Sequence, residues 1–200
     1  MGAWAVEALQ PYFTHLGLMA GDPALARALG LPGRGDLKPG QGPLGGLLSA
    51  LTWAQELGLG GVFLLACDLP LAGGDTVERI LAQGFGDGDA LVPASPGPLG
   101  MEPLCAAYGL ACLEPAQELL VLGRRSMKEL LERVPFSLVS LEALGGARAA
   151  GLRFRNVNTP KDAREVEEIL KTGPFRPAGT PVKADGQAPR TGAGRGEGLP

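Results

Sequence analysis

The sequence predicts an α/β fold in which helices flank a mostly parallel sheet. Residues 62–67 form a continuous apolar run without polar alternation, which is typical of a strand buried on both faces of a parallel sheet. Asp68 ends this run, and Pro70 stops the strand. A glycine-rich helix start precedes the run, and amphipathic helices alternate with further short apolar runs after it. Such alternation favours crossover connections between parallel strands.

The other elements follow from hydrophobic spacing and from residues that start or stop helices. Pro11 interrupts the first helix and predicts a kink or an early end. Asp22 and Pro23 suit the cap and the first position of the second helix, and Thr159 is expected to cap the last one. Helices are predicted over residues 3–15, 23–29, 47–57, 75–83, 114–120, 123–133 and 161–170. Strands are predicted over residues 16–20, 62–67, 90–94, 102–107, 134–140 and 151–155.

Composition restricts the class of protein. With 200 residues and 45% apolar side chains the chain can bury one core, and we assign residues 1–170 to a single domain. No apolar run approaches the roughly 18 residues of a membrane span and no signal-peptide pattern is present, which predicts a cytoplasmic protein without a membrane partner. A net charge of −3 gives no indication of nucleic-acid binding. The single histidine excludes a site built on two imidazoles.

The end of the chain differs in composition from the rest. Residues 171–200 carry five basic and two acidic side chains and consist mainly of Gly, Pro, Ala and Thr. Such a segment cannot bury enough apolar surface to offset the entropy of ordering it, so we predict a disordered basic tail. The tail either contacts a partner or is a solvated chain end, and both interpretations stay open.

Two stretches carry candidate site residues. Gly42, Gly45 and Gly46 open a helix, where glycine lets the backbone approach a ligand closely and the free N–H groups of the first turn favour an anion. The alternative is that these glycines serve only packing. Asp68 follows a buried strand, at the sheet edge where open α/β folds bind ligands, and its carboxylate could hold a divalent metal against phosphate oxygens. The alternative role of Asp68 is to cap the segment that follows.

Five motifs together resemble one family. They are GQGPLGGLLSAL at 40–51, ACDLPL at 66–71, EPLCAAY at 102–108, GRRSMKELL at 123–131 and NVNTPKD at 156–162. In this order and spacing they are similar to the molybdenum cofactor guanylyltransferases, the MobA-like nucleotidyltransferases, over about residues 5–170. The resemblance implies a Rossmann-like, doubly wound α/β domain. It also implies transfer of GMP from GTP to molybdopterin, or of CMP from CTP in the sister branch that makes the cytosine dinucleotide.

The resemblance further implies roles for individual residues. Asp68 is expected to be the catalytic Mg²⁺ ligand at the triphosphate, and the pterin is expected to lie near Asn156 and Asn158. Arg124 and Arg125 would meet anionic phosphate on the pterin acceptor. The nucleotide-binding residues are expected to be Asp36, Gly42, Pro43, Leu44 and Gly45. Two alternatives stay open: the arginines are ordinary surface charge, and the asparagine amides only fix the turn before the last helix.

Nucleotidyl transfer asks the protein mainly to position its substrates and to neutralise charge. A phosphate oxygen attacks the α-phosphorus in line, and pyrophosphate leaves. A single strand-end carboxylate suits Mg²⁺ in such a site, because this ion keeps several waters and needs few protein ligands. The expected ligands are therefore Mg²⁺, GTP and molybdopterin, and the candidate partner proteins are molybdopterin-synthesis proteins and molybdoenzymes.

The beginning of the sequence departs from the family pattern. Family members open with a first strand and a loop of the form LAGGxSxRMGxDK, whose glycines cradle the triphosphate, and no such segment occurs here. We therefore expect the sheet to lack its first, central strand and the chain to lack this phosphate cradle. The first hypothesis is a molybdenum cofactor nucleotidyltransferase truncated by a misassigned initiation codon or by gene decay. The alternatives are a non-catalytic pterin-binding or chaperone relative, and a nucleotidyltransferase that uses CTP or a sugar-phosphate acceptor.

Overall fold

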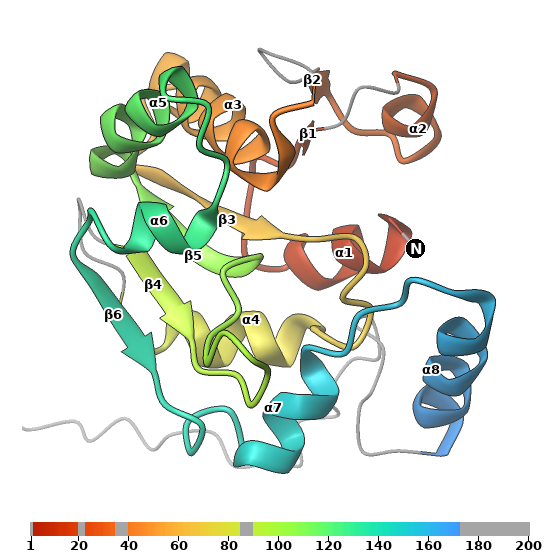
Figure 1. Ribbon diagram of the computed structural model, residues 1–200. Helices are drawn as coiled ribbons and strands as arrows, with labels where there is room; N and C mark the ends of the chain where they lie inside the picture. Colours follow the sequence, from red (N-terminus) through yellow and green to blue (C-terminus); the bar gives the residue numbers. More distant parts are fainter. Residues whose placement is uncertain (1, 20–22, 35–39, 85–89, 173–200) are drawn as a thin grey trace, which may run out of the picture.

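The central sheet has four strands, and helices lie on both of its faces (Figure 1). The computed structural model describes residues 2–19, 23–34, 40–84 and 90–172. β4 and β6 pair in parallel, whereas β5 runs antiparallel to both β3 and β4. The α/β class is confirmed, and β5 is the strand that reverses the common direction of the other three. The order across the sheet is β3 (Gly61–Leu65), β5 (Cys105–Gly109), β4 (Ala90–Pro93) and β6 (Phe136–Val139).

The helices and a small second sheet complete the described part of the chain. The second sheet consists of two short parallel strands, β1 (Leu18–Met19) and β2 (Gly33–Arg34). A short 3₁₀ turn, Leu110–Cys112, joins β5 to the next helix. The α-helices are α1 (Gly2–Leu9), α2 (Pro23–Ala28), α3 (Gly42–Glu56), α4 (Gly74–Leu81), α5 (Leu113–Val121), α6 (Met127–Leu131), α7 (Ala147–Arg153) and α8 (Pro160–Thr172).

Side chains of the central strands alternate between the two faces of the sheet, as the two-residue period of a strand requires. Val92 and Tyr108 pack with leucines of α3, α5 and α6. Leu91 and Ala107 pack on the opposite face, against α4 and the α7 region. Tyr108 is completely buried, and its hydroxyl donates a hydrogen bond of 2.7 Å to the carbonyl oxygen of Pro103. Helices therefore cover both faces of a mixed sheet, which agrees with the doubly wound arrangement that the resemblance implied.

β3 contacts both cores but remains half-buried along its whole length. Val62 and Leu64 reach the core beneath α3, and Phe63 and Leu65 reach the core beneath α4. β3 stands at the edge of the four-stranded sheet, and within the described ranges no further strand pairs with its outer side. The apolar run predicted a strand buried on both faces, and the open edge is the reason why burial is incomplete.

The predicted strand over residues 151–155 is wrong, because this stretch ends helix α7. Gly145 and Gly146, with φ of 90° and 94°, turn the chain into that helix. Arg153 is buried and donates to the carbonyl of Leu144 and, at 2.6 Å, to the carboxylate of Asp75 on α4. These contacts with distant residues fix the last turn of α7, and the local alternation of apolar residues does not reveal them.

Most other predicted elements are present with shifted ends. The first helix stops at Leu9, so the early end expected from Pro11 is confirmed. α3 begins at Gly42, earlier than the predicted start at residue 47, and Pro43 occupies its first turn, where a missing N–H costs nothing. Thr159 caps α8 as expected, since its hydroxyl accepts the N–H of Asp162 at 3.2 Å.

Two further predictions concern membrane crossing and the end of the chain. Within the described ranges, no helix combines the length and apolarity needed to cross a membrane. α8 continues to Thr172, and residues 173–200 lie outside the described part. The tail over residues 171–200 and the domain boundary before it therefore stay predictions.

Candidate functional site

Asp68 lies in a turn just beyond β3, at the carboxyl end of that strand. The turn is anchored on two sides. The N–H of Ala66 donates 2.8 Å to the carbonyl of Leu104, which extends the β3–β5 ladder by one bond. The N–H of Val157 donates 2.9 Å to the carbonyl of Asp68 itself. The ACDLP and NVNTP motifs, far apart in the sequence, therefore meet at one edge of the sheet.

A second carboxylate, Glu102, belongs to the same edge. Its Oε1 accepts the N–H of Leu104 at 3.1 Å, which closes the turn before β5. Burial raises the pKa of Glu102, the hydrogen bond from Leu104 opposes this effect, and the negative charge of Asp68 adds to the rise. In the sequence, Glu102 opens the EPLCAAY motif, and no role was predicted for it. The signal that could have identified Glu102 as a candidate site residue is an acidic side chain directly before a buried strand.

The glycine segment forms the start of α3. Gly40 and Gly42 adopt φ of 78° and 65°, so the turn into the helix requires residues without a Cβ. Gln41 lies between them at the N-cap, and its side chain makes no capping bond. The buried Oε1 of Gln41 has no hydrogen-bond partner. This helix start therefore keeps backbone N–H groups that can meet an anion.

The predicted nucleotide-binding residues have different environments. Gly42 and Pro43 line a cavity that is described below. Leu44 is completely buried in the core beneath α3, so only its backbone could face a ligand. Gly45 is also buried, and its carbonyl accepts the hydroxyl of Ser49 at 2.9 Å. Asp36 lies outside the described residues.

The two arginines of the α5–α6 loop face different partners. Arg125 donates 2.8 Å to the carbonyl of Gly40, which fixes this loop to the glycine segment. Arg124 forms a two-pronged pair with Glu129, both distances being 2.8 Å. This pair raises the pKa of Arg124 and lowers the pKa of Glu129. The structure thus places Arg125 beside the predicted nucleotide segment, whereas the guanidinium of Arg124 already has a carboxylate partner.

Asn156 and Asn158 are exposed on both sides of the buried Val157. In the described part of the chain, neither side-chain amide forms a hydrogen bond. The turn is fixed by backbone bonds instead: the N–H groups of Asn158 and Thr159 both donate to Asp162 Oδ2, at 3.1 and 2.8 Å. The Thr159 hydroxyl, followed by these two backbone N–H groups, holds the pKa of Asp162 below its usual range. The asparagine amides therefore remain available to a ligand.

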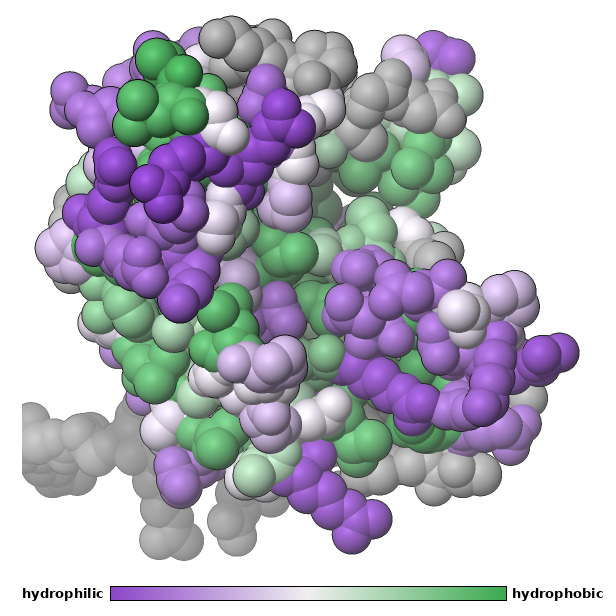
Figure 2. Space-filling model, in the orientation of Figure 1, coloured by the Kyte–Doolittle hydropathy of each residue, from purple (hydrophilic) through white to green (hydrophobic). Residues whose placement is uncertain are grey.

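The predicted pterin-side residues form two pairs, the arginines before α6 and the asparagines before α8. Among the described interactions, no hydrogen bond or ion pair links Arg124 or Arg125 to the asparagines. Figure 2 shows hydrophilic side chains over α5 and α6 on one side and over α8 on the other, with a mainly hydrophobic strip between them.

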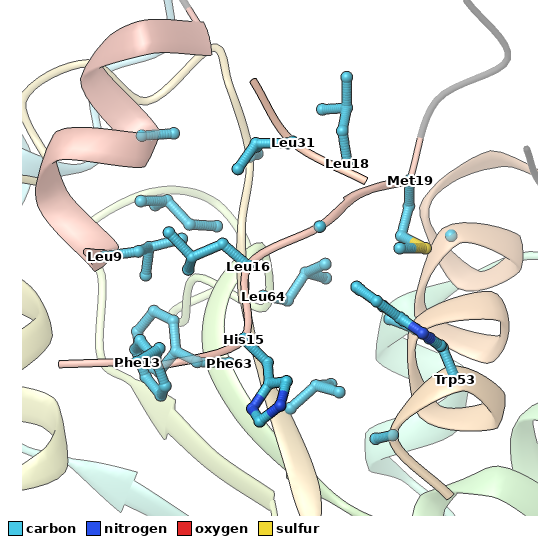
Figure 3. A pocket seen from close by; sticks show the side chains of 18 of the residues that line it. Leu9, Phe13, His15, Leu16, Leu18, Met19, Leu31, Trp53, Phe63 and Leu64 are labelled. Carbon is cyan, nitrogen blue, oxygen red and sulfur yellow. The ribbon is translucent and has the colours of Figure 1, made fainter. Parts of the chain in front are cut away.

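A cavity of about 940 Å³ adjoins the site. β3, one face of α3, α1 and the segment from Tyr12 to Met19 enclose it, and its lining is mostly apolar (Figure 3). Trp53 projects from α3 toward this space, and the ring of Phe13 lies 5.6 Å from that of Phe63, centre to centre. Cys67 also lines the cavity, so one end of it reaches the turn that carries Asp68.

The chemistry of this edge suits a hard divalent cation. Asp68 and Glu102 offer carboxylate oxygens, which Mg²⁺ prefers. Within the described ranges, no cluster of three or more His, Cys, Asp or Glu side chains could hold a metal. An ion bound by one or two carboxylates would complete its shell with water and phosphate oxygens, which is the usual arrangement for Mg²⁺.

Comparison with known proteins identifies the family to which the chain belongs. Residues 1–139 match the family described as MobA-like NTP transferase domain. The chain is 31% identical over 173 residues to a molybdenum cofactor guanylyltransferase of Cereibacter sphaeroides, covering 84% of this chain and 81% of that protein. The crystal structure of molybdopterin-guanine dinucleotide biosynthesis protein A from Archaeoglobus fulgidus superposes with a TM-score of 0.66 at 26% identity, over 84% of each chain. A protein from Aquifex aeolicus gives a TM-score of 0.65 at 25% identity, over 78% of each chain. The chain belongs to the MobA-like NTP transferase family.

Proposed function

We propose that this protein is a Mg²⁺-dependent nucleotidyltransferase that transfers GMP from GTP to molybdopterin. The hydrogen bond from Val157 to Asp68 carries the proposal, because it joins a candidate metal ligand to a segment with two exposed amides. The relative from Cereibacter sphaeroides, which is named as a guanylyltransferase, supports the choice of nucleotide.

In this reaction a phosphate oxygen of the pterin attacks the α-phosphorus of GTP. The new bond joins this oxygen to the α-phosphorus, the bond from the α-phosphorus to the bridging oxygen breaks, and pyrophosphate leaves with that oxygen. Asp68, with Glu102 beside it, would hold the Mg²⁺, which supplies positive charge to the phosphates when bound. The protein's own contribution is to hold these groups in position before the reaction.

The exposed amides of Asn156 and Asn158 suit the acceptor side. An amide both donates and accepts hydrogen bonds, and a pterin ring presents both kinds of group along its edge. On the donor side, the start of α3 offers N–H groups to an anion, and Arg125 fixes the segment before it through Gly40. In this proposal the start of α3 binds the donor nucleotide, and the asparagine amides bind the acceptor.

The test is formation of molybdopterin guanine dinucleotide from GTP, Mg²⁺ and molybdopterin, followed by chromatography. We expect Asp68→Asn to lower the rate by about 100-fold, because a lost electrostatic contact at the reacting phosphates commonly has this effect. Glu114→Gln removes an exposed carboxylate from α5 and should leave the rate unchanged. An undiminished rate in Asp68→Asn would contradict the proposal.

Parallel reactions separate the alternatives. CTP in place of GTP tests the choice of base, and a sugar phosphate in place of molybdopterin tests the acceptor. Saturable binding of molybdopterin without turnover of any nucleotide would select the non-catalytic pterin-binding hypothesis.

A further inference from the structure

Two segments that are far apart in the sequence lie side by side. The first is the Asp68 segment, residues 68–76, and the second is the asparagine segment, residues 153–158, which carries the two exposed amides. The N–H of Val157 donates to the carbonyl of Asp68 at 2.9 Å, and Arg153 contacts the start of α4. The earlier end of each segment thus meets the later end of the other, so the two segments run in opposite directions. Figure 1 shows α7 beside α4, which places the start of the asparagine segment there.

Buried apolar side chains pack between these two points of contact. Phe154 belongs to the same core as Leu69 and Ala72. Val157 belongs to a separate cluster with Leu71. All five residues are buried, and none is more than 8% exposed. The asparagine segment is therefore held by packing along its length and by hydrogen bonds to the Asp68 segment at two places.

Arg153 supplies the polar bonds at the start of the asparagine segment. Its guanidinium donates 2.6 Å to the carboxylate of Asp75 and 2.7 Å to the hydroxyl of Thr76, and its Nε donates 3.2 Å to the carbonyl of Leu144. Arg153 is 5% exposed, and Thr76 is completely buried. Arg79, one turn further along α4, lies 3.9 Å from the same carboxylate. A guanidinium suits this place because its rigid fork of donors can reach several acceptors at once.

A buried arginine of this kind defines geometry more than it adds stability. A buried ion pair commonly stabilises a fold no better than apolar side chains of similar volume, because both charges lose water. Its bonds are directional, however, and together they favour one position of α7 relative to α4. The turn that carries Asp68 has an anchor of its own, the bond from Ala66 to Leu104 beside the β3–β5 ladder. The asparagine segment lies outside the sheet, and Arg153 is its polar anchor at the α7 end.

We propose that Arg153 is a positioning residue for the acceptor, because it fixes the asparagine segment relative to Asp68 and so sets where Asn156 and Asn158 hold the acceptor. This inference rests on the proposed function, which assigns the two amides to molybdopterin. Arg153 itself touches no substrate. Loss of its bonds would let the segment shift, and a displacement of about 1 Å can slow a transfer reaction by about 100-fold. The donor side should change little, because the Asp68 turn keeps its own bond to the β5 side.

The first test follows the N–H of Val157 by hydrogen exchange, which reports the contact between the two segments without any substrate. In Arg153→Met we expect this proton to exchange at least about ten-fold faster than in the wild type, because the asparagine segment opens more often. The N–H of Ala66, on the β5 side of the Asp68 turn, should keep its protection. Leu119→Ala truncates a completely buried side chain on the other face of the sheet and controls for a general loss of stability. It should leave the ratio of the two exchange rates unchanged.

The second test separates the two substrates of the proposed reaction. In Arg153→Met we expect kcat/KM for molybdopterin to fall by about 10- to 100-fold, whereas the KM for GTP should change by less than about two-fold. Arg153→Lys keeps a charged donor for Asp75 but loses the fork, so its values should lie between those of Arg153→Met and the wild type. Arg133→Met removes an arginine from an exposed ion pair with Glu118 and should match the wild type in both constants.

Three results would overturn the proposal. One is a Val157 N–H that is as protected in Arg153→Met as in the wild type. Another is an equal loss of kinetic efficiency for the two substrates. The third is a Leu119→Ala variant with the same pattern as Arg153→Met, because Arg153 would then contribute only stability. If the wild type forms no dinucleotide, the proposed function fails, and the exchange comparison alone then decides whether Arg153 fixes the asparagine segment.

Discussion

β3 and β4 have similarly apolar sequences and lie in the same sheet, but their burial differs. Every residue of β4 is buried, and every residue of β3 is half-buried. β4 has a strand on each side, whereas β3 pairs only with β5 in the described part of the chain. The comparison shows that an apolar run indicates a capacity for burial, and that the neighbouring strands decide how much of this capacity is used.

The difference in burial between β3 and β4 can be tested by truncating a leucine in each strand. Leu91→Ala in β4 should lower the free energy of unfolding by about 2–5 kcal/mol, because the side chain is 3% exposed and leaves a cavity. Leu64→Ala in β3 should cost about half as much, since the side chain already borders open space. Urea denaturation followed by circular dichroism measures both. Equal losses would mean that the edge of β3 is covered in solution.

A smaller effect on stability is expected at Glu102, which precedes β5, the strand that pairs with β3. Because burial raises its pKa in the folded state, the folded protein holds this proton more tightly than the unfolded chain. Stability from this group is therefore present below the ordinary pKa of 4.5 and is lost as the pH rises through the folded value. Glu102→Gln removes the charge and retains an acceptor for the Leu104 N–H.

We expect the Tm of Glu102→Gln to match the wild type near about pH 4 and to exceed it near about pH 7. Thermal unfolding at the two pH values measures the difference. Glu132→Gln, which removes an exposed carboxylate at the end of α6, should show no such change between the two values. A Tm difference that is independent of pH would show that Glu102 does not carry a raised pKa.

The smallest effect is expected at the opposite edge of the sheet. Leu138 in β6 is 52% exposed, and Leu138→Thr should change the free energy of unfolding by less than about 0.5 kcal/mol. The same urea experiment measures it. A loss as large as that of Leu64→Ala would show that β6, too, is covered in solution.

The sequence determined the elements whose signals are local. The apolar run of β3, the early helix stop near Pro11 and the cap at Thr159 each depend on residues a few positions apart, and all three are present. The same holds for the motif order that resembles the MobA-like family, which the comparisons confirmed. Local patterns work here because periodicity, missing N–H groups and capping side chains act within one turn or one strand.

Only the tertiary structure decided which distant groups meet. Hydrogen bonds join Val157 to Asp68, Arg125 to Gly40 and Arg153 to Asp75, across sequence separations that no local pattern encodes. The tertiary structure also brought Glu102 to the edge of the sheet that carries Asp68 and left β3 half-buried. These contacts depend on the order of the strands and the placement of the helices. Both result from the packing of the whole chain, because residues remote in sequence supply most of the environment of a buried side chain.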